Sequence, residues 1–207
     1  MATLRTLSKS DYKAARSCPT KLYYKELGYP STKDDNPYLA MLANGGYMVE
    51  KMAKLLYPDG RDMPYDGGSE ESARRTMEAL SAERVTLFEA TFVSRGKLAR
   101  VDILEKQGKV FNLIEVKSKS YSSAAAQARA DAAQPNIFRG KKGEIESKWQ
   151  DYLEDATFQA VVLRELFPEA IVRPFLALVD KNKTSSIDAV HQLSLIHISE
   201  PTRQAEI

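Results

Sequence analysis

The chain has 207 residues, of which 43% are hydrophobic and 28% are charged, and its formal net charge is +2. This length and composition are ordinary for a soluble protein with one globular domain and a real core. No stretch approaches the roughly 18 apolar residues of a membrane span, and no signal peptide is recognisable at the N-terminus. The single cysteine excludes a disulfide framework or a cysteine-rich zinc site. We therefore expect a cytoplasmic protein without membrane association.

Positive charge is spread unevenly along the chain. Residues 1–30 hold six Lys and Arg against two acidic residues, and residues 95–148 hold twelve against six. Basic surfaces of this kind favour a polyanionic partner, although they also occur on proteins that never bind nucleic acid.

The first 37 residues predict an N-terminal helical extension. Ser8 or Ser10 is a suitable N-cap, and the first helix should end near Ser17 because Pro19 disfavours a helical residue before it. Pro19 can open a second short helix. We expect this pair to bury Tyr12, Leu22 and Tyr23, and we expect the main domain over 38–193.

A longer helix is predicted from about residue 38 to 57, with Leu39, Leu42, Val49, Met52 and Leu56 at helical spacing. Gly45 and Gly46 inside this helix indicate close packing against a neighbour. Glu50 lies near the edge of the apolar stripe, so it is either an exposed carboxylate or a group that faces a site.

The centre of the sequence predicts a strand over 84–93 and then a hairpin over 99–117, with a turn at Gln107-Gly108. Asp102 lies between apolar residues of one strand, and Glu115 and Lys117 share a face of the next. Burying unpaired charge is costly, and two carboxylates beside an ammonium suit a hard cation such as Mg²⁺. A plain salt bridge on an exposed sheet is the alternative interpretation.

Further along, residues 118–143 are rich in small and polar side chains and predict a surface loop with helix starts. A helix is predicted over 149–167, with Gln159 on its apolar face as either a satisfied core amide or a pocket-facing group. A last, almost wholly apolar strand over 171–179 reads as a parallel strand reached by a helical crossover.

Three motifs together resemble the PD-(D/E)XK nuclease superfamily, and its RecB-like subgroup most closely. They are Ser-x-Ser followed by Cys18-Pro19, Asp102 with Glu115-Val116-Lys117, and the helix that contains Gln159. The subgroup includes CRISPR-associated exonucleases, and within it the chain looks most like uncharacterised bacterial proteins in which such a domain begins a longer chain. The resemblance implies an αβββαβ core, that is, a central mixed four-stranded sheet flanked by helices. Cys18 is alone, so the iron–sulfur cluster of some relatives is not expected, and Leu163 replaces the tyrosine that often follows the glutamine.

The resemblance also implies a metal-dependent nuclease that hydrolyses phosphodiester bonds, with DNA expected rather than RNA. Asp102 and Glu115 would bind one or two Mg²⁺ or Mn²⁺ ions, with the Val116 carbonyl as a further ligand and Glu50 completing the shell. Lys117 would position the attacking hydroxide, and Gln159 would orient the pocket.

Three alternatives remain open. The first is a non-catalytic nucleic-acid-binding module on the same fold, and the second is a structural domain in which these charges form a plain ion-pair cluster. A phosphotransfer enzyme is the third, but the sequence has no glycine-rich phosphate loop. Residues 194–207 resemble translated read-through of a sequencing adapter, so we expect a non-native tail and a natural chain that continues differently, with a further C-terminal part that could add a partner domain.

Overall fold

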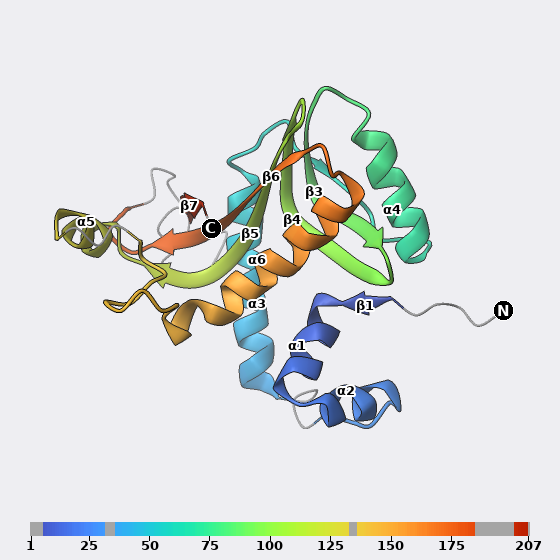
Figure 1. Ribbon diagram of the computed structural model, residues 1–207, viewed down its shortest axis with the longest axis horizontal. Coiled ribbons are helices and arrows are strands. Elements are labelled where there is room, and N and C mark those ends of the chain that lie inside the picture. The colour runs from blue at the N-terminus through green and yellow to red at the C-terminus, as the bar shows by residue number, and fades with distance from the viewer. Residues whose placement is uncertain (1–5, 32–35, 133–135, 185–200, 207) are drawn as a thin grey trace.

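The computed structural model describes residues 6–31, 36–132, 136–184 and 201–206, and in this part of the chain six helices surround one mixed sheet (Figure 1). The helices are α1 (Lys9–Ser17), α2 (Pro19–Glu26), α3 (Pro37–Lys54), α4 (Gly68–Ala79), α5 (Ser123–Asp131) and α6 (Ser147–Leu166). The strands are β1 (Leu7–Ser8), β2 (Arg61–Asp62), β3 (Arg84–Ser94), β4 (Lys97–Gln107), β5 (Val110–Tyr121), β6 (Ile171–Asp180) and β7 (Pro201–Glu206). The expected mixed α/β class is confirmed.

The sheet has the strand order β2-β3-β4-β5-β6-β7, and β1 pairs with β4 outside this path. Strands β3, β4 and β5 form an antiparallel meander, whereas β6 runs parallel to β5. The long helix α6 makes this parallel return possible, because parallel neighbours need a crossover connection. The four longest strands, β3 to β6, therefore form a mixed central sheet, which the short strands β1, β2 and β7 extend.

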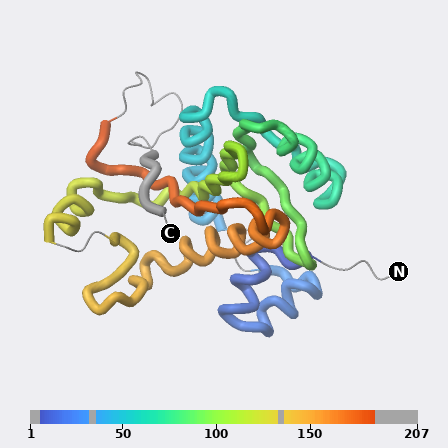
Figure 2. Tube along the Cα trace, turned by 45° about the horizontal axis from the view of Figure 1, so that its top comes forward, coloured from blue at the N-terminus to red at the C-terminus, as the bar shows by residue number. Residues whose placement is uncertain are grey.

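Helices cover both faces of the sheet. Figure 1 shows α6 in front of the strands and α3 behind them, and in the turned view of Figure 2 these two helices again lie on opposite sides of the strands. Beneath α6 the core contains the fully buried side chains Leu87, Phe92, Leu104, Leu113 and Leu163. Beneath α3 it contains Val49, Ile103, Ile114 and Ala177. A third cluster, around Trp149 and Leu178, closes the far end of β5 and β6.

The first N-terminal helix begins and ends where the sequence predicts, and the second begins there. Ser8 caps α1 in a capping box with Asp11, and Pro19 is the first residue of α2. Tyr12 stacks on Phe158 of α6 with 5.5 Å between ring centroids, which holds α1 against the main body. The expected burial of Tyr23 is wrong, because 60% of its surface is exposed. Strand β1 also joins these helices to the same sheet as the main domain.

Other differences from expectation are local. Helix α3 ends at Lys54, three residues before the expected end at Tyr57. A Cβ atom on Gly46 would meet no neighbouring atom within 4 Å, so the expected close packing there is wrong. Helix α5 lies in the segment expected to be a surface loop with helix starts, and β5 extends to Tyr121 before it.

The end of the chain is only partly described. Strand β7 pairs antiparallel with β6 and lies within the expected non-native tail. The remaining residues of that tail, and residues 185–193 of the expected main domain, lie outside the described residues. None of the described helices is long and apolar enough to cross a bilayer.

Candidate active site

The strand pair β4–β5 opens at the position of the acidic residues. Its paired register runs from Gln107↔Val110 to Ile103↔Ile114 and goes no further. Just beyond this last pair, Asp102 Oδ2 accepts a hydrogen bond of 2.7 Å from the Val116 amide. A side-chain carboxylate thus takes a hydrogen bond that a strand carbonyl would otherwise accept, which places a polar group inside the sheet.

The pairing of β4 with its other neighbour, β3, is also irregular at Asp102. Glu89 stands opposite Asp102 between the pairs Phe88↔Ile103 and Ala90↔Val101, and its φ of 57° lies in the left-handed region. Val101 and Leu104, three residues apart, both join the core beneath α6, so the alternation of β4 changes phase at Asp102. Such interruptions re-aim side chains and gather near functional sites, since a non-glycine residue with this backbone costs about 1 kcal/mol or more.

Glu115 forms the centre of the site and has no exposed surface. Its Oε1 atom accepts hydrogen bonds from Lys9 Nζ at 2.5 Å and from Lys117 Nζ at 2.6 Å. Its Oε2 atom accepts a hydrogen bond of 2.5 Å from Gln159 Nε2. A buried carboxylate needs such partners to remain charged, and they come from α1, β5 and α6.

Asp155 extends the cluster along α6. It is buried, and its two oxygens lie 3.1 Å from Lys13 Nζ and 3.1 Å from Lys117 Nζ. Lys117 therefore bridges two buried carboxylates. Asp155 is not among the residues predicted from the sequence, although it precedes Gln159 by four residues and so shares a helix face with it. Lys9 is not among them either, because no local pattern indicates it.

Electrostatic interactions within the cluster shift two pKa values strongly. Burial, followed by the charge of Glu115, raises the pKa of Asp102 to about 8. Burial acts to lower the pKa of Lys117, but the Glu115 and Asp155 carboxylates outweigh it and raise that pKa above its usual range. Without a cation, these surroundings thus favour the protonated form of Asp102 and the charged form of Lys117.

Glu50 lies in a second charged cluster, on the α3 side of the sheet. Its carboxylate is 3.0 Å from Lys54 Nζ, which also lies 3.5 Å from Glu89. Arg100 Nε is 2.9 Å from the other oxygen of Glu89. Burial and a hydrogen bond with Glu50 raise the pKa of Glu89 to about 7. The structure therefore joins Glu50 to Glu89, whereas Asp102, Glu115, Lys117 and Gln159 come together around the opening.

The residues around the opening can be tested for their fit to a divalent cation. Among the described residues, no group of three or more His, Cys, Asp and Glu side chains is placed to hold a metal ion. The chemistry of the donors nevertheless fits, because Asp102 and Glu115 supply carboxylates. In addition, Gln159 is wholly buried and its Oε1 atom has no hydrogen-bond partner in the described part of the chain. An orphan acceptor beside the Glu115 carboxylate suits a cation or its water.

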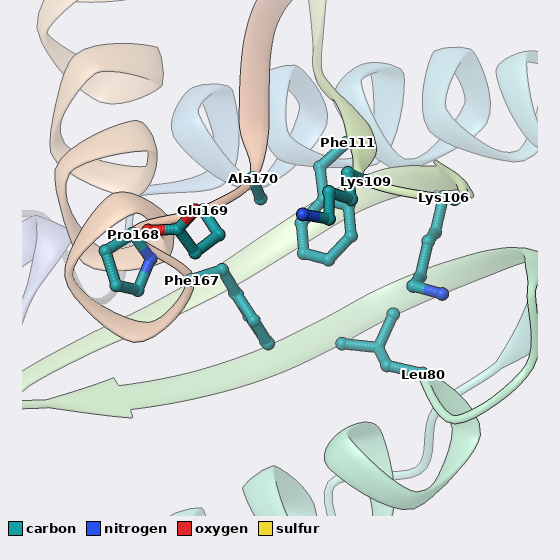
Figure 3. A pocket seen from close by; sticks show the side chains of 9 residues that line it. Leu80, Lys106, Lys109, Phe111, Phe167, Pro168, Glu169 and Ala170 are labelled. Atoms are coloured by element: carbon teal, nitrogen blue, oxygen red, sulfur yellow. The ribbon is translucent and has the colours of Figure 1, made fainter.

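A separate cavity of about 240 Å³ lies at the hairpin end of β4 and β5 (Figure 3). Its lining includes Leu80, Lys106, Phe111 and Phe167. Glu115 lies five residues along β5 from its near end at Val110, or about 17 Å in an extended strand. This mainly apolar cavity is therefore distinct from the charged opening.

Comparison with known proteins adds no assignment. No family model, no curated protein and no solved structure matches this chain.

Proposed function

We propose that this protein is a metal-dependent nuclease of the PD-(D/E)XK type. The observation that carries the proposal is the meeting of Asp102, Glu115, Lys117 and Gln159 at the opening between β4 and β5. The order of α3, β3, β4, β5, α6 and β6 supports it, because these elements match the implied αβββαβ order once the additional elements β2, α4 and α5 are set aside.

Asp102 and Glu115 would hold Mg²⁺ or Mn²⁺, and the orphan Oε1 atom of Gln159 would face the ion or its water. The Val116 carbonyl and Glu50 remain predicted ligands, the latter only after leaving its contact with Lys54. When bound, such an ion polarises a phosphoryl oxygen and lowers the pKa of water.

The chain's own residues would orient the reacting groups. Lys117 is held between Glu115 and Asp155 and stays protonated, so it would act as a fixed positive charge toward the phosphate and not as the base. Gln159 fixes the rotamer of Glu115 through Oε2. Asp155 in turn positions Lys117, which gives the site the outer support that precise geometry needs.

A non-catalytic nucleic-acid-binding module is the second candidate. The observation in its favour is that Glu115 is already neutralised by Lys9 and Lys117, so a cation must compete with two ammonium groups. The excess of basic residues in 1–30 and 95–148 suits a polyanion under either hypothesis.

Cleavage of labelled single- and double-stranded DNA and RNA, with Mg²⁺ or Mn²⁺, separates the two candidates. The nuclease hypothesis predicts cleavage that EDTA, Asp102→Ala and Lys117→Ala each abolish. The control is Lys97→Ala, because Lys97 also pairs with a carboxylate, that of Glu165 at 3.0 Å, and has a similar exposure but lies outside the cluster. Nucleic-acid binding without cleavage by the wild-type protein would favour the module.

A further inference from the structure

Another cavity, which is polar and has a volume of about 320 Å³, lies at the end of β5 that is far from the hairpin. Four of its lining residues are cationic, and none of them is acidic. The lining consists of Lys119, Ser120, Tyr121, Ser122, Ala125, Ala126, Arg129, Ile137, Lys148, Trp149 and Lys181. A concave surface with this charge favours an anionic ligand.

Two buried donors in this lining lack an acceptor. Trp149 is 5% exposed, and its Nε1 atom has no hydrogen-bond partner within the described ranges; the same is true of the Arg129 Nε atom. A buried donor without a partner is costly, and native proteins rarely leave two of them in one place. Neither atom has accessible surface, so neither reaches a ligand in the cavity as it stands, and it is the positive charge of the lining that favours a ligand with acceptor oxygens here.

The neighbouring carboxylates do not cancel the positive charge. Glu146 pairs with Arg129 at 2.9 Å and with Lys148 at 2.5 Å. Asp180 is buried near Tyr121 and accepts hydrogen bonds from the Ser123 and Asn182 amides. Four cationic side chains thus face two carboxylates, and Lys181 lies exposed in the lining.

Lys119 connects the cavity to the candidate active site. The β5–β6 pairing shifts register between Lys117 and Ser120, and the residues between them form a bulge. Lys119 Nζ then lies 5.3 Å from the ring centroids of both Trp149 and Tyr152. Two residues span at most about 7 Å, so an extended polyanion that contacts Lys117 can also reach Lys119.

We infer that this cavity binds a phosphate group of a nucleic-acid strand, next to the phosphate that the candidate active site would hold. The inference rests on the proposed function for the identity of the strand. A phosphate fits better than a base, because Lys119 and Lys148 both lie over the Trp149 ring and so cover the surface on which a base would stack.

Trp149 is the single tryptophan of the chain, so its intrinsic fluorescence reports on this cavity alone. The titration uses the full chain in EDTA, which prevents metal-dependent cleavage, with a ten-residue thymidine oligonucleotide and with inorganic phosphate as probes. The inference predicts a saturable change with the oligonucleotide. Lys181→Met should weaken its affinity about threefold to tenfold and reduce the dependence on salt by about one counterion. Lys109→Met, an exposed lysine at the hairpin end of β5, should leave the affinity unchanged.

Lys119→Met removes a side chain that lies over the Trp149 ring, so it alters Trp149 fluorescence even without a ligand. The affinity of this variant is therefore measured by the fluorescence anisotropy of a labelled oligonucleotide. An oligonucleotide that is cleaved with metal but does not alter Trp149 fluorescence would overturn the inference and leave the proposed function standing. A response that Lys181→Met lowers, without any metal-dependent cleavage, would support the cavity and contradict the nuclease. A response to inorganic phosphate alone would also contradict the inference, since it would indicate a site for free phosphate.

Discussion

Asp102→Asn should raise the stability of the metal-free protein, and the gain should grow with pH. In the unfolded chain an aspartate ionises near pH 3.8, whereas in the folded protein burial and Glu115 raise the pKa of Asp102 to about 8. Between these values the unfolded state loses a proton that the folded state keeps, so the stability that Asp102 contributes below pH 4 is lost as the pH rises to 8.

The pKa difference sets an upper limit of about 6 kcal/mol, at about 1.4 kcal/mol for each pH unit. Asp102 is only half-buried and two lysines lie close by, so screening reduces the expected loss to about 2 kcal/mol. Asparagine cannot ionise, but its amide oxygen can still accept the hydrogen bond from Val116.

Urea unfolding of both proteins in EDTA, at pH 5, 6, 7 and 8, measures this effect as the difference between their free energies of unfolding. Asp102→Ala is the matched control, because it shows the same trend with pH but loses the Val116 hydrogen bond and is less stable throughout by about 1 kcal/mol. A difference between wild type and Asp102→Asn that stays constant from pH 5 to pH 8 would refute the proposed electrostatics.

Two further substitutions test the cluster and its surroundings. Lys9→Met should lower the free energy of unfolding by about 1 kcal/mol or less, because Glu115 keeps its hydrogen bonds with Lys117 and Gln159. Glu115→Ala should lower it by about 3 kcal/mol or more, because two ammonium groups lose their carboxylate. Equal losses of the two variants in urea unfolding would contradict this asymmetry. Leu163→Tyr, which introduces the tyrosine often found at this position in RecB-like domains, should destabilise the protein by about 2 kcal/mol, since Leu163 is fully buried in a packed core. Unchanged thermal unfolding of this variant would show that the core beneath α6 has room for the larger side chain.

The sequence predicts those parts of the fold that depend on local signals. Ser8 and Pro19 set the bounds of α1 and α2, and the hairpin turn at Gly108 and the apolar strands define the meander. Burial of Tyr23 could not be judged, because an amphipathic pattern does not show which side a neighbour covers. The surroundings of Glu50 could not be judged either, because helical spacing does not reveal that its carboxylate lies in a cluster with Lys54 and Glu89.

Contacts between distant segments were the hardest to anticipate. Lys9 and Glu115 are 106 residues apart, and no pattern in either segment indicates their 2.5 Å contact. Asp155 could have been predicted from the sequence, because its spacing from Gln159 places both residues on one helix face. The left-handed backbone of Glu89 has no sequence signal at all, since glutamate rarely adopts it.

Calorimetric titration with Mn²⁺ at pH 8 tests most directly whether the Asp102–Glu115 cluster is a metal site. We predict saturable binding by the wild-type protein and a loss of at least tenfold in affinity for Asp102→Asn, with Lys97→Met unchanged. Binding should weaken toward pH 6, because the cation must then displace the proton of Asp102. The absence of saturable binding, or binding that Asp102→Asn leaves intact, would contradict the metal site and identify the charges around Glu115 as an ion-pair cluster.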